Sequence, residues 1–406
     1  PALQERAGAL EYRPLRAEVA AARGACAETL GDYAAATAAM REAVVDGVAA
    51  RHDVMAVEVA TRLIHVLAFR QARHAEADVW LDVAGALRDR LGGRDDLRVR
   101  VMLSRGGALI VAGKPAEALR WLDDAEALLE KIGGPLTTEM GIILNNRAAA
   151  HSRLGHPEQV VAAFERALAI YRQTLGPAHP DIALVMGNLG TVRALSGDLA
   201  GAEAIQREAL ALKERLLGPE HPDIAVLLTN LSMIHERRKD HAAGRAVLER
   251  ALAIREKTLG PDNPSTASSL INLGDLFNEL GEAEAALPLL RRALGVLEKV
   301  EGPNHPTVAA ALVRLARAEM LGGADREARG HLERAAAIHA ASGAASIEAS
   351  FTDFYLARAQ WATSRTPQER ARARATAEAA LAKADRVALA DEVAKLEAWL
   401  AGLRAD

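Results

Sequence analysis

The sequence predicts an all-α protein made of stacked helix pairs, and three observations lead to that fold class. A Gly-Pro pair returns every forty-two residues, at Gly176-Pro177, Gly218-Pro219, Gly260-Pro261 and Gly302-Pro303, and Gly134-Pro135 extends the series backwards. A fixed period of this length is typical of repeat arrays. Half of the residues are hydrophobic but only 3% are aromatic, so the core consists mostly of Ala and Leu. Such a core favours closely packed helices over strands.

Two other residue types recur in phase with the glycines. One is an alanine column, and the other is an asparagine column: Ala125, Ala167, Ala209, Ala251, Ala293 and Ala335; Asn146, Asn188, Asn230 and Asn272. The repeat is therefore a structural unit, and function is expected on its surface.

Residues 183–224 illustrate one unit. Apolar spacing predicts a first helix from Ala183 to Ser196, a break at Gly197-Asp198 and a second helix from Leu199 to Leu217. Gly218 suits a left-handed residue after the second helix, and Pro222 biases His221 toward an extended conformation. The expected N-caps of the first helices are good capping types: Asp181, Asp223, Ser265 and Thr307.

These features resemble the forty-two-residue tetratricopeptide repeat of the kinesin light chain type. The matching strings are LGPAHPDIALVMGNLG, LGPEHPDIAVLLTNLS and LGPDNPSTASSLINLG, each followed by REAL, ERAL or RRAL in the second helix. The resemblance is specific over residues 141–340 and weaker outside. It implies a right-handed α-solenoid superhelix of antiparallel helix pairs.

The predicted order of segments follows this repeat. We expect an N-terminal lead-in helix over 1–16 and an array over 17–350, with eight repeats that start near 17, 57, 99, 141, 183, 225, 267 and 309. A divergent ninth repeat follows over 351–386, where Thr366-Pro367-Gln368-Glu369 indicates a capping box. The segment 387–406 is expected to form a capping helix from Val387 to Leu403, with its apolar face on Leu389, Val393, Leu396 and Leu400.

Charge and composition argue against nucleic acid and membranes as binding partners. A net charge of −4 and a pI near 6.4 give no strong field for nucleic acid or anionic membranes. The run Arg370, Arg372 and Arg374 lacks interleaved aromatics and is expected to be a solvated face. No run of about eighteen apolar residues and no signal segment occurs, so we expect a cytoplasmic protein that does not enter membranes. Because the chain begins at Pro1, we expect it to be a piece of a longer protein.

The sequence contains no convincing catalytic, metal-binding or nucleotide-binding motif. Cys26 is expected to be a buried, inert thiol. His179, His221 and His305 recur one per repeat, too far apart to share a metal ion. The Gly107–Lys114 stretch has the wrong glycine spacing for a phosphate-binding loop, and Pro115 replaces the required Ser or Thr. No triad, HExxH or CxxC motif is present. We therefore predict no catalysis, metal or cofactor.

The asparagine column marks the candidate binding surface. Counting Ala183 as slot one, the core stripe takes slots four, seven and eight, so slots two, six, nine and thirteen form the opposite, first-helix face. Slot six is the asparagine. Asn is unfavourable inside a helix, and two explanations stay open. The carboxamides form a ladder that binds an extended peptide, as the resemblance implies for such asparagines, or each bonds to the adjacent repeat.

Apolar and basic side chains share this face, which favours a ligand. In the eighth unit Arg314 replaces Asn, with Arg317 beside it, while Asp275 and Glu279 lie in the seventh. The two arginines either anchor a ligand carboxylate or form ordinary salt bridges. The predicted peptide-binding residues are Asn146, Asn188, Asn230, Asn272, Ile142, Leu184, Val226, Met233, Arg153, Arg237, Arg314 and Arg317.

The predicted function is a noncatalytic protein-protein interaction scaffold that binds an extended peptide or partner segment in the concave groove, which the resemblance implies is lined by the first-helix face. Two alternatives remain. The opening stretch YRPLRAEVAAARGACAETLGDYAAATAAMREA resembles the repeat tail of some bacterial serine/threonine protein kinases, which implies a sensory or substrate-recruiting role beside a kinase domain in the same full-length chain. The other alternative is a self-assembling structural array.

Overall fold

The computed structural model describes residues 12–29, 32–71, 73–92, 94–133, 137–342, 347–383 and 390–403. In these residues the chain is helical between its loops and contains no strand, as predicted. Contacts divide the chain into two compact units, unit 1 (Pro1–Leu212) and unit 2 (Lys213–Asp406), and each is described by itself.

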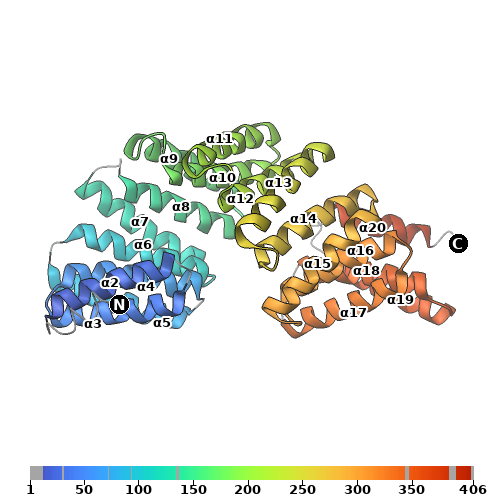
Figure 1. Cartoon of the computed structure of the whole chain (residues 1–406), viewed down its shortest axis with the longest axis horizontal. Helices are drawn as coiled ribbons and strands as arrows, with labels where there is room; N and C mark the ends of the chain where they lie inside the picture. The colour runs from blue at the N-terminus through green and yellow to red at the C-terminus, as the bar shows by residue number, and fades with distance from the viewer. Residues whose placement is uncertain are drawn as a thin grey trace. The chain divides into compact units, whose positions relative to one another are not determined.

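Unit 1 is a stack of helix pairs in which each helix packs against the next along the chain (Figure 1). Its elements are α2 (Arg13–Thr29), α3 (Tyr33–Ala49), α4 (Asp53–His65), the π-helical segment η1 (Val66–Arg70), α5 (His74–Leu91), α6 (Asp95–Val111), α7 (Pro115–Ile132), α8 (Thr138–Arg153), α9 (Pro157–Thr174), α10 (Pro180–Leu195) and most of α11 (Leu199–Leu217).

Unit 2 repeats the arrangement and ends in a single helix. Its elements are α12 (Pro222–Arg237), α13 (His241–Leu259), α14 (Pro264–Leu280), α15 (Ala283–Glu301), α16 (Pro306–Leu321), α17 (Asp325–Ser342), α18 (Ile347–Thr363), α19 (Pro367–Lys383) and α20 (Ala390–Gly402).

Small residues set the close approach of the helices in each pair. Every member of the alanine column is fully buried. On the first helices the matching position is often glycine, and a Cβ added at Gly274 would lie 2.7 Å from Leu290 Cγ, while one at Gly190 would lie 2.7 Å from Gln206 Cγ. The side chain of the second helix therefore occupies the space that a larger residue on the first helix would need.

The N-caps of the first helices differ from the prediction. His179, His221, Asn263 and His305 are the caps, and their side chains accept hydrogen bonds from backbone N–H groups two residues later, at 3.3, 3.2, 2.8 and 3.4 Å. The prediction of Asp181, Asp223, Ser265 and Thr307 as N-caps was wrong. The reason is that proline takes the first helical position in all four helices, which moves the cap to the residue before it. The loop histidines His179, His221 and His305 thus act as N-caps.

The loop between repeats otherwise follows the prediction. Gly218 and Gly260 have φ of +86° and +85°, which L side chains rarely adopt. His221 is extended, with φ −70° and ψ 141°. A proline after the glycine prevents the second helix from continuing.

The C-terminal end contains the expected cap and closing helix. Thr366 and Glu369 form the predicted capping box, with Glu369 N–H donating to Thr366 Oγ1 at 3.2 Å and Thr366 N–H donating to Glu369 Oε2 at 3.0 Å. In α20, Val393, Leu396 and Leu400 are buried.

Some predicted features lie outside the described residues: the start of the capping helix at Val387 with Leu389, the Gly134-Pro135 pair, and residues 1–11 of the lead-in helix. Residues 13–16 form the first turn of α2.

Cys26 is exposed, so the prediction of a buried thiol was wrong. The buried stripe of α2 runs through Ala17, Ala20 and Gly24, which packs against Met40. Two residues after Gly24 the helix has turned by about 200°, which directs Cys26 away from α3. No described helix is long and apolar enough to cross a membrane.

Candidate functional site

Several first helices of successive pairs lie next to one another within each unit. In unit 1 α6 contacts both α4 and α8, and in unit 2 α14 contacts α12 and α16, while α16 also contacts α18. On the first-helix face Ile142, Leu184 and Val226 are 39%, 51% and 50% exposed. Apolar side chains are therefore presented to solvent along this face.

The asparagine column is half-buried and makes no hydrogen bond within the described part of the chain. The amide that bonds to the adjacent repeat is instead Asn278, whose Nδ2 donates to the Arg314 carbonyl oxygen at 2.9 Å. Sequence reasoning missed Asn278 because it does not recur at the repeat period, so no column reveals it. The column amides keep their donors and acceptors available.

A cavity of about 580 Å³ opens on the first-helix face of unit 1. Residues from α4, η1, α6 and α8 line it, and these include the predicted Asn146 and Ile142, together with Asn145. The Oδ1 atom of Asn145 is buried and has no partner among the described residues. Two asparagines with unused hydrogen-bonding atoms therefore line one cavity.

The π-helical segment supplies an aromatic wall. Its i+5 bond runs from Gln71 N–H to the Val66 carbonyl oxygen at 3.2 Å, and it carries Phe69, which is 44% exposed and stacks on His65 with ring centroids 4.7 Å apart. A Cβ on Gly107 would lie 3.1 Å from Phe69 Cζ and 3.9 Å from Asn146 Nδ2. The Phe69 ring and the Asn146 amide therefore both lie close to Gly107, which has no side chain to separate them. π-segments occur frequently at functional sites.

The charges around this cavity are paired. Arg62 bonds to Glu28, and Arg100 lies 3.5 Å from Glu58 and 3.9 Å from Glu139. Burial lowers the pKa of His65, and the positive charges of neighbouring arginines act in the same direction against the opposing effect of Glu28. The imidazole is accordingly neutral at neutral pH.

A smaller cavity of about 150 Å³ lies in unit 2 between α12, α13 and α14. The predicted residues Asn272 and Met233 line it, with Glu236 and Asp275. Burial, followed by the charges of Asp275 and Glu279, raises the pKa of Glu236. This part of the face is acidic.

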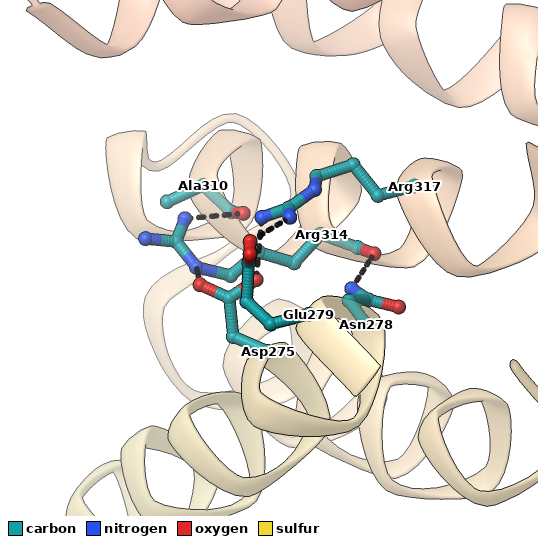
Figure 2. Close-up of polar contacts among 6 residues, drawn as sticks. All are labelled: Asp275, Asn278, Glu279, Ala310, Arg314 and Arg317. Atoms are coloured by element: carbon teal, nitrogen blue, oxygen red, sulfur yellow. Dashed lines mark hydrogen bonds and ion pairs between the residues drawn. The ribbon is translucent and has the colours of Figure 1, made fainter. Parts of the chain in front are cut away.

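The two arginines of the eighth unit form ion pairs (Figure 2). Arg317 bonds to Asp275 at 2.7 Å and also to Glu279, while Arg314 Nε lies 3.4 Å from Asp275. The Arg317 guanidinium also lies 5.3 Å from the centre of the Tyr355 ring. Burial, the largest influence, lowers the Arg317 pKa, but the carboxylates outweigh it and the pKa is raised. The pairs correspond to the salt-bridge alternative, and a ligand carboxylate would compete with Asp275 and Glu279.

The remaining predicted residues lie on the expected helices but line neither of these two cavities. Asn188 and Leu184 are on α10, Asn230 and Val226 are on α12, and Arg153 and Arg237 are exposed at the ends of α8 and α12.

The comparisons with known proteins agree with this architecture. The sequence profile described as "Tetratricopeptide repeat" matches residues 97–173, 139–215, 181–243, 223–299 and 276–341, which together span more than half of the chain. None of the curated proteins compared with the sequence matches it.

Several solved structures are similar. The apo form of RapI is 14% identical, with a TM-score of 0.62 over 80% of this chain and 86% of RapI. A Rap protein complexed with Competence and Sporulation Factor is 13% identical, with a TM-score of 0.52 over 86% of this chain and 97% of that one. A putative kinesin light chain with nearly identical TPR-like repeats from Podosopora anserina is 25% identical, with a TM-score of 0.43 over 49% of this chain and 94% of that one.

Proposed function

Since the chain belongs to the tetratricopeptide repeat family, whose fold is typical of protein–protein interaction scaffolds, we propose that it is a noncatalytic scaffold that binds an extended peptide on its first-helix face. The observation that carries the proposal is the unit 1 cavity, where Asn146 and Ile142 lie beside Phe69. An unbonded amide next to exposed apolar surface offers both the polar and the apolar contacts that a peptide needs.

The carboxamides suit a peptide backbone because each can both donate and accept. Helix layers lie about 8 to 10 Å apart and an extended chain advances about 3.3 Å per residue, so one asparagine meets roughly every third ligand residue. Sequence preference then comes from the neighbouring side chains, which are aromatic at the unit 1 cavity and acidic at the unit 2 cavity.

Hydrogen bonds alone are too weak for useful affinity. Within unit 1, Asn146 and Asn188 at about 0.5 to 1.5 kcal/mol each contribute about 1 to 3 kcal/mol, whereas micromolar affinity needs about 8. Burying the exposed parts of Ile142, Leu184 and Phe69 adds to this, because full burial of one such side chain contributes about 1.5 to 3 kcal/mol.

A displayed library of linear peptides tests the proposal directly. Peptides are selected on the purified full chain, and their affinities are then measured for Asn146→Ala and for Asn304→Ala. Asn304 is an exposed loop amide and serves as the matched control. We expect Asn146→Ala to weaken binding about fivefold or more and Asn304→Ala to leave it unchanged.

Two outcomes contradict the proposal. One is a library that yields no peptide enriched over a bead control. The other is an enriched peptide whose affinity is the same for both variants. Circular dichroism of both variants checks that their helix content is retained.

A further inference from the structure

A separate cavity of about 480 Å³ lies at the C-terminal end of unit 2. Side chains from α14, α16, α18 and α20 line it, together with Asp325 at the start of α17. None of the column asparagines borders it. Its volume falls in the range of about 300 to 1,000 Å³ that is typical of small-molecule sites.

Asn278, one of the residues that line the cavity, has an unused hydrogen-bond acceptor. Asn278 is 5% exposed, and its Oδ1 has no donor among the described residues. The orientation of the amide is fixed, because the Arg314 carbonyl only accepts and so requires Nδ2 on its side. Figure 2 shows the side-chain oxygen directed away from that carbonyl. A buried acceptor without a donor costs about 1 to 3 kcal/mol, and a ligand N–H would remove that cost.

Two cations of the cavity have no carboxylate within ion-pair distance in the described part of the chain. Arg358 is half-buried and lies 6.0 Å from the Tyr355 ring centre, and Lys395 reaches the cavity from α20. The third cation, Arg317, is already paired with Glu279 and Asp275. Asp325 is a carboxylate of the same cavity that forms no ion pair with any described residue. The cavity is therefore lined by two cations and one carboxylate that form no ion pair with a described residue.

Aromatic rings provide the apolar part. Trp361 of α18 and Trp399 of α20 meet edge to face, with centroids 5.9 Å apart and planes at 85°. The guanidinium carbon of Arg370 lies 5.5 Å from the centre of the Trp361 ring. Burial raises the pKa of the Tyr355 hydroxyl, which keeps this group neutral and able to donate.

We propose that this cavity binds a free α-amino acid with a large apolar or aromatic side chain. The ammonium group donates to Asn278 Oδ1 and faces Asp325, and the carboxylate is bound by Arg358 and Lys395. The side chain lies against Trp361 and Trp399. A zwitterion fits because the unpaired groups of the wall carry both signs, whereas a simple anion would leave the acceptor and Asp325 without a partner.

Isothermal titration calorimetry on the full chain tests the ligand class. L-phenylalanine, L-tryptophan and L-leucine are titrated separately, followed by L-phenylalaninamide and N-acetyl-L-phenylalanine. The last two lack the carboxylate or the ammonium group and mimic the terminal residues of a peptide. We expect at least one of the three amino acids to bind, and each blocked form of phenylalanine to bind about tenfold more weakly than L-phenylalanine, or not at all.

Matched variants locate the binding. Arg358→Gln and Lys395→Ala are each expected to weaken binding about tenfold, while Arg291→Ala, which removes an exposed arginine from α15, leaves it unchanged.

Three results overturn the proposal. One is no binding by any of the three amino acids at about 1 mM. A second is equal binding of the acetylated form, which points to the C-terminus of a peptide instead. The third is equal weakening by the Arg291 control, which indicates that the charge change acts on the protein as a whole.

Discussion

Gly274→Ala tests how the first and second helices of a pair fit together. The added Cβ would lie 2.7 and 2.8 Å from the Cγ and Cδ2 atoms of Leu290, which is fully buried. Alanine in place of glycine inside a helix gains about 0.5 to 1 kcal/mol from backbone entropy. Crowding a packed core costs about 1 to 3 kcal/mol. We therefore expect the free energy of unfolding to be unchanged or to fall by up to about 2.5 kcal/mol.

The control is Gly330→Ala in α17, where a Cβ meets nothing within 4 Å. This variant gains the same entropy without crowding, so its free energy of unfolding should rise by about 0.5 to 1 kcal/mol. The two variants should thus differ by about 1 to 3 kcal/mol. Urea unfolding, followed by the helical circular dichroism signal, measures the free energy of unfolding of both variants.

A double-mutant cycle isolates the contact. Leu290→Ala alone should cost about 2 to 5 kcal/mol. In that background the added Cβ of Gly274→Ala has space, so the second substitution should become stabilising, as it is at Gly330. The reasoning fails if Gly274→Ala is as stable as Gly330→Ala, or if its effect is the same with and without Leu290.

Three further predictions concern charges, caps and the thiol. Arg317→Met should lower stability by about 3 kcal/mol or less, because Glu279 loses its partner but is more than a third exposed. In the native protein burial raises the Glu279 pKa but Arg317 outweighs it, so the pKa is lowered and the stability from this pair is lost as pH falls below the ordinary value of 4.5. In Arg317→Met the free energy of unfolding should instead rise as pH falls, because Glu279 is then partly buried without its partner. Urea titrations at several pH values measure this dependence, and an unchanged dependence on pH argues against the pair. His221→Ala should cost about 1 kcal/mol and His221→Asn much less, since Asn263 caps the equivalent helix; equal urea midpoints for the two would contradict the cap. Cys26 should react with a maleimide in the folded protein, and labelling that begins only after unfolding would show that the thiol is buried.

Much of the fold can be predicted because it depends on local signals that repeat. The predicted bounds of Leu199–Leu217 agree with α11, and the capping box at Thr366 depends on four consecutive residues. The N-cap prediction failed because proline fixes the first helical turn, so the cap is the residue before the proline and not the Asp, Ser or Thr after it. The exposure of Cys26 does not follow from its apolar neighbours, because it depends on which face of α2 packs against α3.

Features that occur once could not be predicted from a periodic pattern. The π-helical turn at Val66–Arg70 has no counterpart in the other described repeats, and it is what brings Phe69 to the unit 1 cavity. The Asn278 bond to the Arg314 carbonyl depends on the spacing of two helices, which sequence does not give. The resemblance of the N-terminal stretch to kinase tails stays a prediction.

The central claim is that a peptide lies on the first-helix face, and photo-crosslinking tests it most directly. A benzophenone amino acid is placed at Ile142 on α8 and, in a separate protein, at Val79 on the second helix α5, where the native side chains are 39% and 59% exposed. A selected, labelled peptide should crosslink on irradiation from position 142 and not from position 79. Crosslinking from 79 alone, or equally from both positions, would contradict the account.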